Sequence, residues 1–549
     1  MVAVTERPVP AGPEPSVGRA NARLRLRPLW HLLGAIAGGL MLAGAFPPLG
    51  WWPLAIPATA LLFWSVRGAR VWSAFVVGLA GGFSFYGTHI IWLTTYLGPV
   101  PWLALAGVET LFFAVAAVVI SLAWRWGARF SNTPAWQLLG LPVVLAGLWT
   151  AREGIVSVWP YGGFSWGRLS FSQSEGPFRD LVAWVGAAGL SFVLALIAAM
   201  LLQAVIIMLG RGRLLLRVIR IAPTISLTLI ALMVPAWPVE TTGEVRVAAV
   251  QGNADAGLWS QRERGAILDD HLQATVPILG EEVDLVVWPE NAADLNPLRY
   301  PQAAGVLDFV SEEMDAPLLA GTITDGPEDE TFNSMLLWQA GEGFVDQYDK
   351  IHPVPFAEYL PDRDFWYPLA PDLFDLIPRD YSFGERPNVL DIALSDGESL
   401  AAGVAICFDI VDDELLHEMI DGGAEIILAP TNNADFGQSA ESEQQLAIAR
   451  LRAIEYGRSV VNISTVGMSA IIAPDGSTIS DLPTFEPGAM VEQVPLSTTV
   501  TPAASIGRVI EWTVSGIGLL GVAMLGFVAL RRARGGTSGS GGDHDGRDA

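Results

Sequence analysis

The sequence has little of three things: cysteine, lysine and charge. Its single cysteine, Cys407, excludes an intramolecular disulfide and any metal site built from several cysteines. Its single lysine, Lys350, stands beside 31 arginines, and a lysine kept at one position suggests a chemical role there, because a compact ammonium and a planar guanidinium are not interchangeable. Charged residues make up only 16% of the chain, against about 25% in ordinary globular proteins, which disfavours a soluble protein.

Apolar residues, by contrast, are abundant. They make up 51% of the 549 residues, and the mean hydropathy is +0.40. A helix needs about 20 apolar residues to cross the hydrocarbon core of a membrane, and two of the apolar segments, 51–66 and 136–150, are short for this purpose. We predict a polytopic α-helical membrane domain with about eight spans, at 30–47, 51–66, 71–93, 102–124, 136–150, 181–209, 218–237 and 507–530.

Charge is distributed unevenly along the chain, and this distribution predicts the topology. The segment 240–500 has 47 acidic and 11 basic residues, whereas arginines cluster in the N-terminal tail, in alternate connections between spans and after the last span. Basic flanks remain in the cytoplasm, so eight spans place both termini there and the acidic segment on the extracytoplasmic side. The acidic surface argues against nucleic acid as a partner.

These patterns divide the chain into five regions. They are a basic cytoplasmic tail at 1–29, a membrane domain of seven helices at 30–238, an extracytoplasmic catalytic domain at 239–505, a C-terminal transmembrane helix at 506–531 and a disordered cytoplasmic tail at 532–549. In the catalytic domain, β-rich runs alternate with helical patterns, as in a layered α/β fold. The predicted strands are 245–250, 284–288, 317–323, 400–407, 425–429, 460–463 and 470–473, and the predicted helices are 261–278, 301–314, 412–421 and 439–457.

Three motifs in this domain carry residues capable of chemistry. DLVVWPE ends in Glu290, YDKIHPVPFAEY at 348–359 carries Lys350, and GVAICFD at 403–409 carries Cys407. Taken alone, a cysteine after an apolar strand is more often a small buried hydrophobe, and the acid and the lysine have equally ordinary explanations. Reactive groups at several strand ends are, however, a common way to build a site on a rigid sheet. The three motifs together favour a catalytic site.

The chemistry of these residues fits acyl transfer. A thiol attacks as thiolate, and Glu290 is a suitable general base for its proton. Lys350 and the backbone N–H of Phe408 are candidate donors to the oxyanion of a tetrahedral intermediate. The product on Cys407 would be a thioester, which a second nucleophile resolves.

The motifs resemble the nitrilase superfamily with its Glu-Lys-Cys triad, and the flanking spans narrow this to the apolipoprotein N-acyltransferase family, its membrane-embedded branch. The resemblance covers roughly residues 30–530. It extends to VAAVQGN at 247–253, FNSM at 332–335, TNNADFG at 431–437, ARLRAIEYGR at 449–458 and GGFSWGRLSFSQSEGP at 162–177.

The resemblance implies an α-β-β-α sandwich on a helical base in a bacterial plasma membrane. It implies a phospholipid acyl donor and a diacylated apolipoprotein as acceptor, with membrane lipid around the enzyme and no cofactor or metal. By position, Glu358 would be a supporting active-site carboxylate, and Trp259, Asn333 and Asp409 would line the substrate site. The sequence departs from the family pattern at Phe408-Asp409, where Tyr-Glu is frequent, and at Asp435, where an aromatic residue is frequent.

Two other functions stay open at this stage. A membrane-tethered amidohydrolase would use the same triad with water as acceptor, and a non-catalytic scaffold would retain a degenerate domain. The aromatic-rich segment 359–383 is either a membrane-facing lid or an insertion packed on the core.

Overall fold

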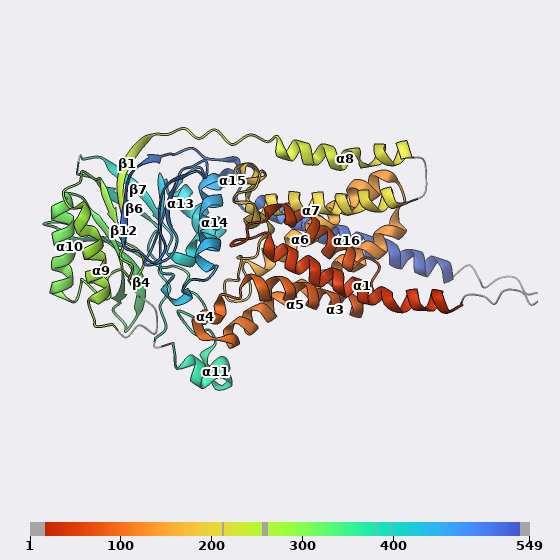
Figure 1. The fold of residues 1–549 in the computed structure, drawn as a ribbon, viewed down its shortest axis with the longest axis horizontal. Helices are drawn as coiled ribbons and strands as arrows, with labels where there is room; N and C mark the ends of the chain where they lie inside the picture. The colour runs from red at the N-terminus through yellow and green to blue at the C-terminus, as the bar shows by residue number, and fades with distance from the viewer. Residues whose placement is uncertain (1–16, 211–213, 255–261, 378, 396, 538–549) are drawn as a thin grey trace, which may run out of the picture.

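The computed structural model describes residues 17–210, 214–254, 262–377, 379–395 and 397–537. Within them the chain forms two parts that lie end to end along the long axis, a bundle of long helices and an α/β part with two sheets (Figure 1). The α/β part comes from the middle of the sequence. The helix that follows it, α16 (Val509–Thr537), returns to pack against helices that precede it.

The helical bundle is built from the apolar segments of the sequence. Each of the eight predicted segments contains a helix, and five helical stretches in the described residues are long and apolar enough to cross a membrane: Val71–His89, Pro99–Phe130, Trp136–Val156, Arg179–Leu209 and Val509–Arg534. The helices besides α16 are α1 (Val17–Gly44), α2 (Ala55–Ser65), α3 (Val71–His89), α4 (Leu93–Leu97), α5 (Pro99–Phe130), α6 (Leu141–Val156), α7 (Val182–Leu209) and α8 (Leu214–Leu232).

Two glycines allow α16 to lie directly against α6. A Cβ atom on Gly147 would lie 2.5 Å from the carbonyl oxygen of Val514, and one on Gly518 would lie 2.4 Å from the carbonyl carbon of Gly147. Small residues permit this close approach, which matters in membranes because burial from water does not drive helices together there. The helix that follows the α/β part is thus held against one that precedes it.

The α/β part contains two six-stranded mixed sheets. The first has the order β12-β1-β2-β3-β4-β5 and the second the order β11-β10-β9-β8-β7-β6. The strands of the first sheet are β1 (Gly243–Gln251), β2 (Leu285–Val287), β3 (Leu318–Asp325), β4 (Thr331–Gln339), β5 (Gly343–Asp349) and β12 (Gly488–Leu496). Those of the second are β6 (Val389–Ala393), β7 (Ser399–Val404), β8 (Ile426–Thr431), β9 (Ser459–Ser464), β10 (Ser469–Ile472) and β11 (Thr478–Leu482).

The sheets face each other across an apolar core, and helices cover their outer faces. Successive side chains of a strand point to opposite faces. In β1, Val247 and Ala249 therefore enter the core between the sheets, while Ala248 and Val250 pack under α9 (Ala266–Thr275) and α10 (Pro301–Met314). In β8, Leu428 points into the core and Ile427 points outward. The result is the predicted α-β-β-α sandwich.

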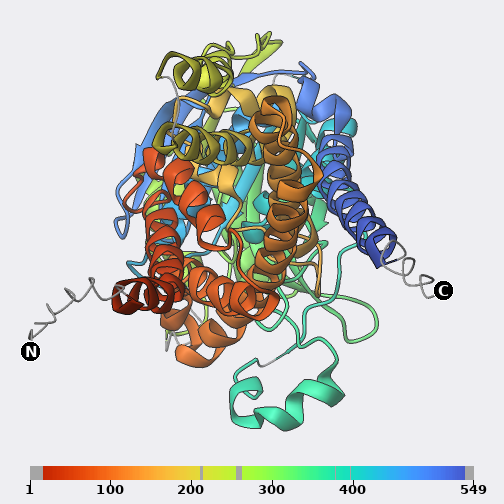
Figure 2. The same ribbon diagram turned by 90° about the vertical axis from the view of Figure 1, so that its right-hand side faces the viewer.

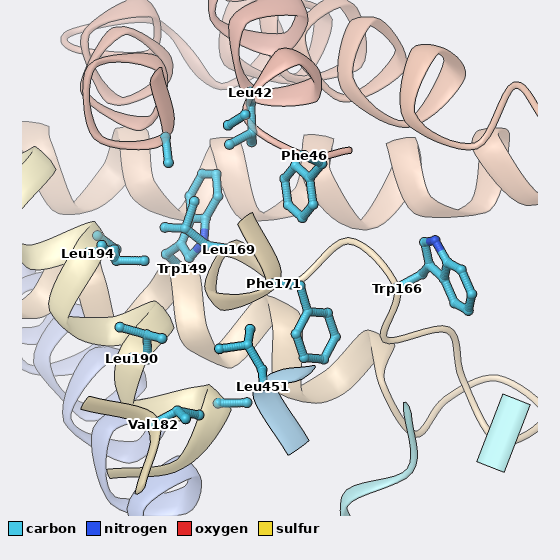
Figure 3. Packing of buried hydrophobic residues seen from close by; sticks show 14 of the residues in the cluster. Leu42, Phe46, Trp149, Trp166, Leu169, Phe171, Val182, Leu190, Leu194 and Leu451 are labelled. Atoms are coloured by element: carbon cyan, nitrogen blue, oxygen red, sulfur yellow. The ribbon is translucent and has the colours of Figure 1, made fainter. Parts of the chain in front are cut away.

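The two outer helix layers have different surroundings. The layer of α9 and α10 lies at the end of the molecule far from the bundle, whereas α13 (Asp413–Asp421) and α14 (Glu441–Tyr456) lie between the second sheet and the bundle (Figure 1). Leu451 of α14 belongs to the same buried cluster as Phe171, Val182 and Leu190 of the bundle (Figure 3). The second sheet is therefore the one that is attached, through α14, to the helical bundle.

The aromatic-rich segment lies outside the cores of both parts. It contains α11 (Arg363–Trp366) and α12 (Pro371–Phe374) and protrudes at one side of the molecule (Figure 2). Leu360, Phe374 and Ile377 form a small cluster of their own, while Phe365 and Leu369 are exposed. The segment is not packed into the core between the sheets.

Candidate active site

The loop after β2 carries Glu290 and is fixed from two sides. Trp288, just before it, is fully buried and donates its indole N–H to Thr275 Oγ1 (3.2 Å). On the other side β3 approaches through Gly321, where a Cβ atom would lie 2.4 Å from the carbonyl oxygen of Pro289. The position of Glu290 is thus set by packing that only a glycine in β3 permits.

Asn333 on β4 joins two carboxylates beside the lysine. Its Nδ2 donates to Glu290 Oε1 (2.7 Å) and to Glu358 Oε1 (2.9 Å). The other oxygen of Glu358, Oε2, lies 2.9 Å from Lys350 Nζ and accepts from the backbone N–H of Val354 (2.6 Å). Lys350 is buried, so its charge is balanced within the site rather than by water.

Cys407 starts a 3-10 helix, η7 (Cys407–Val411), shortly after β7. Its φ is +53°, in the left-handed region that residues other than glycine rarely adopt. Asp409, two residues on, accepts from the backbone N–H of Ile406 (3.1 Å) and from the hydroxyl of Tyr348 (3.0 Å). Because Tyr348 lies on β5, the turn that holds the thiol is tied to the opposite sheet.

The electrostatics couple the thiol to the acid and the lysine. Burial raises the pKa of the Cys407 thiol, Glu290 raises it further and Lys350 lowers it. Burial also raises the pKa of Glu290, against the lowering effect of Lys350. Burial alone would lower the pKa of Lys350, but the carboxylates of Glu358 and Glu290 outweigh it and raise this pKa. At neutral pH the site holds a thiol beside an ammonium, with a carboxyl whose raised proton affinity suits a general base.

Most residues singled out in the sequence therefore meet at one place. Glu290, Lys350, Glu358, Asn333 and Cys407 share one site at the ends of strands from both sheets. Burial, as the largest effect, raises the pKa of Asp409 to about 7, and its bonds support the turn of Cys407. Trp259 lies in 255–261, outside the described residues.

Four further residues near the thiol were missed in the sequence: Thr431, Asn433, Glu441 and Gln445. Gln445 donates its amide N–H to the Cys407 carbonyl oxygen (3.0 Å), and its Nε2 lies 3.9 Å from Cys407 Sγ. Neutral polar residues in a helical pattern ordinarily indicate a solvated face. The TNNADFG motif at 431–437, which contains Thr431 and Asn433, was the one available signal.

The nucleophile turn also abuts the helical bundle. The ring of Phe408 is nearly parallel to those of Phe164 and Trp166, with centroids 6.0 Å and 6.1 Å away. Next to Gln445 in α14, Gln444 accepts from the indole N–H of Trp166 (2.7 Å) and of Trp92 (3.0 Å). The site therefore lies at the boundary between the two parts of the molecule.

Comparison with known proteins gives two family matches. Residues 38–200 match the apolipoprotein N-acyltransferase N-terminal domain, and residues 246–502 match the carbon-nitrogen hydrolase family. A relative from Mycolicibacterium smegmatis named apolipoprotein N-acyltransferase is 35% identical over 534 residues, which cover 90% of this chain and 85% of the relative. The chain belongs to the apolipoprotein N-acyltransferase family. It is accordingly an acyltransferase, with a nitrilase-like catalytic domain and membrane helices.

The chain is also similar to a further relative and to solved structures. An apolipoprotein N-acyltransferase from Azotobacter vinelandii is 32% identical, with 92% of this chain and 96% of the relative covered. Among solved structures, a mutant of the Nesterenkonia AN1 amidase from the nitrilase superfamily covers 47% of this chain and 94% of its own, with a TM-score of 0.36 and 18% identity. Saccharomyces cerevisiae Nit3, of branch 10 of that superfamily, covers 47% and 91% with a TM-score of 0.34 and 17% identity.

Proposed function

We propose that this apolipoprotein N-acyltransferase moves an acyl chain from a phospholipid to Cys407 and then to the α-amino group of the S-diacylglyceryl-cysteine at the N-terminus of a lipoprotein. One arrangement carries the proposal: the half-buried thiol interacts with Glu290 and Lys350 at the boundary with an apolar helical bundle. A lipid donor can reach such a site from the bilayer, and the charged network is shielded from water, which would otherwise compete as acceptor.

In the first half-reaction Glu290 takes the thiol proton while Sγ attacks the ester carbonyl carbon of the phospholipid. A C–S bond forms, and the oxyanion is stabilised by Lys350 and by the backbone N–H of Phe408. The ester C–O bond then breaks, and Glu290 returns the proton to the leaving oxygen of the lysophospholipid. Glu358 keeps the ammonium of Lys350 in place through the 2.9 Å contact.

In the second half-reaction the amine of the acceptor attacks the thioester carbonyl. The C–N bond forms, the C–S bond breaks, and Glu290 takes a proton from the nitrogen and returns it to the departing thiolate. Asn333 orients Glu290 through both steps, because its amide holds one carboxylate oxygen (2.7 Å) and leaves the other available. The cycle restores the thiol, as a ping-pong mechanism requires.

The proposed topology has eight spans, both termini in the cytoplasm and the catalytic domain at 239–505 outside it. It is supported by the arginine-rich flanks and by α1 and α16, whose outer ends both lie at the end of the molecule far from the sheets (Figure 1). The test uses Cys407→Ser, which removes the only cysteine, with either Ser395→Cys or Asn132→Cys added. A membrane-impermeant maleimide should label the first variant in intact cells and the second only after permeabilisation; the reverse result contradicts the topology.

We further propose that the protruding segment 359–383 is a lid that contacts lipid. Phe365 and Leu369 are 62% and 66% exposed, which is costly in water but favourable against acyl chains. Polar side chains connect the segment to the bundle. The hydroxyl of Tyr161 donates to Asp362 (2.6 Å) and accepts from the Trp366 indole N–H (3.1 Å).

Intact-mass measurement of the purified enzyme tests the reaction. After incubation with phospholipid, the wild type should gain one acyl chain on Cys407 and lose it when a diacylated lipopeptide is added, which becomes N-acylated. Cys407→Ala should do neither, and N-acylation by this variant would contradict the proposal. Hydrolysis of small amides without lipid, in place of acyl transfer, would indicate the amidohydrolase.

A further inference from the structure

Polar side chains approach Cys407 from two directions, and the proposed mechanism uses only those on one side. Glu290, Lys350 and Glu358 approach from the first sheet, while Gln445 reaches the nucleophile from α14 on the other side. Gln445 is 2% exposed and its Nε2 lies 3.0 Å from the carbonyl oxygen and 3.9 Å from Sγ of Cys407. This makes it a second kind of donor beside the reacting atom, neutral rather than charged.

The orientation of this amide is fixed by its neighbours. Gln445 Oε1 accepts from Asn433 Nδ2 (2.9 Å) and from the hydroxyl of Thr431 (3.1 Å). Asn433 is fixed in turn, because its Oδ1 accepts from the hydroxyl of Ser464 (2.6 Å), whose oxygen accepts from the backbone N–H of Gly467 (2.9 Å). The Cys407 carbonyl oxygen can only accept, so the Gln445 atom beside it must be the donor nitrogen, and Oε1 faces Asn433 and Thr431.

We propose that Gln445 is a catalytic residue whose amide N–H donates to Cys407 Sγ whenever the sulfur is negatively charged. This role rests on the proposed function of Cys407 as nucleophile. The same donor acts twice, on the thiolate that attacks the phospholipid ester and on the thiolate that leaves when the amine displaces it. Its bond to the Cys407 carbonyl oxygen also holds the peptide of a residue at φ +53° in place.

The contribution of Gln445 to the stability of the thiolate can be separated from that of the charges around the sulfur. Glu290 and Lys350 on one side and Glu441 on the other also act on the thiol, and the hydroxyl of Thr431 lies within its reach. The charges of Glu290, Lys350 and Glu441 do not change when Gln445 becomes Met, which has similar length and no N–H to donate. Loss of the donor should make the thiolate less stable while the fold and the charged network remain.

Two variants and a control test the proposal in the full-length protein in detergent. Gln445→Met removes the donor. Asn433→Leu removes the N–H that holds Gln445 Oε1 without adding a charge, so the amide of Gln445 loses its fixed orientation toward Cys407. Gln493→Met, at an exposed position on β12, is the matched control. The readout is the rate of alkylation by iodoacetamide across pH 7–10, which reports Cys407 alone because the chain has no other cysteine.

A lost hydrogen bond of ordinary strength corresponds to a rise of about half to one unit in thiol pKa, so alkylation of both variants at pH 8 should be about 3- to 10-fold slower than in the wild type. N-acylation should slow by a similar factor, and Gln493→Met should match the wild type. Wild-type alkylation rates in both variants, at every pH, would overturn the proposal and leave Gln445 a structural tie. Absence of an acyl adduct on wild-type Cys407 would instead refute the proposed function, so the two failures are distinguishable.

Discussion

The helices α10 and α14 occupy equivalent places in the sandwich, each covering the outer face of one sheet. In α10 five of the fourteen residues are buried, on one side of the helix, as expected for a helix exposed to water on the other. In α14 fourteen of the sixteen are buried, although Glu441, Gln444, Gln445, Arg452 and Glu455 are among them. Equivalent positions in one fold thus carry different chemistry.

The difference follows from what lies beyond each helix. A helix buried on all sides would ordinarily be apolar all round, because buried polar groups are costly without partners. In α14 each polar residue has one: Gln445 bonds to the nucleophile, Gln444 to indoles of the bundle, and Arg452 to Asp413 (2.6 Å). The helix thereby connects the membrane part to the turn of Cys407, a connection for which α10 has no counterpart.

The largest loss of activity is expected on substitution of Lys350, which follows β5 of the first sheet. Lys350→Arg keeps the charge but places a larger planar group where a compact ammonium is buried beside Glu358. N-acylation should fall about a thousandfold, at the upper end of losses for an oxyanion donor. Arg386→Lys, at a half-exposed position nearby, is the control. Near-normal activity in Lys350→Arg would show that charge alone suffices.

The next largest effect, a loss of stability, is expected on substitution of Arg452 in α14. It is fully buried, pairs with Glu455 (2.6 Å) and donates to the carbonyl oxygens of Ile410 (3.1 Å) and Val411 (2.9 Å) at the end of η7. Arg452→Leu leaves the buried carboxylate of Glu455 without its cation, while Asp413 keeps Arg168 (2.6 Å), and should destabilise the protein by about 3 kcal/mol.

The control for Arg452→Leu is Arg299→Leu, just before α10, where the side chain is 67% exposed and the change should stay within about 0.5 kcal/mol. Thermal unfolding in detergent measures both. Equal shifts for the two variants would mean that the faces of the sandwich do not differ as proposed.

A smaller effect is expected at Gln444, the contact between α14 and the bundle. Its Nε2 also donates to the carbonyl oxygens of Pro47 (3.0 Å) and His89 (3.1 Å). Gln444→Leu leaves the indole N–H groups of Trp92 and Trp166 buried without an acceptor and should cost about 2 kcal/mol. Gln273→Leu on the exposed side of α9 should cost little. Limited proteolysis between the two parts, faster only in Gln444→Leu, would show that the helix holds them together.

The same contrast explains which strands could be predicted from sequence. The seven predicted strands correspond to β1, β2, β3, β7, β8, β9 and β10, which lie inside the sheets and are mostly apolar. Four of the five that were missed, β5, β6, β11 and β12, are the edges of the two sheets, where half-exposed strands have mixed composition. The fifth, β4, carries the polar Asn333 and Ser334, which the site and its surroundings require.

The active site shows a similar limit. Glu290, Lys350 and Cys407 stand in distinctive motifs, and their proximity could be inferred from the order of these motifs. The role of Gln445 could not be inferred, because it depends on how α14 is oriented over the second sheet. Asn433 stands in the TNNADFG motif, but its bond to Gln445 depends on the same orientation. That orientation is set by contacts with the bundle, such as those of Gln444, which no local pattern encodes.

The smallest expected effect is a pH-dependent change in stability on substitution of Glu441, at the start of α14. Burial raises its pKa from 4.5 to about 8, only partly offset by the amide of Asn433, which donates to its Oε2 (2.7 Å). Because the folded protein holds this proton more tightly than the unfolded chain does, the stabilisation is complete below about pH 4.5 and is lost as the pH rises to about 8.

Glu441→Gln keeps an oxygen for the Asn433 amide but cannot ionise, so it should be more stable than the wild type by an amount that is smallest near pH 5 and grows as the pH rises to about 8. Glu312→Gln on the exposed face of α10 should change stability at neither pH. Thermal midpoints in detergent from pH 5 to 9 measure both. Parallel curves for Glu441→Gln and wild type would mean that this carboxylate stays ionised in the fold, and that the buried polar residues of α14 tolerate a charge beside the nucleophile.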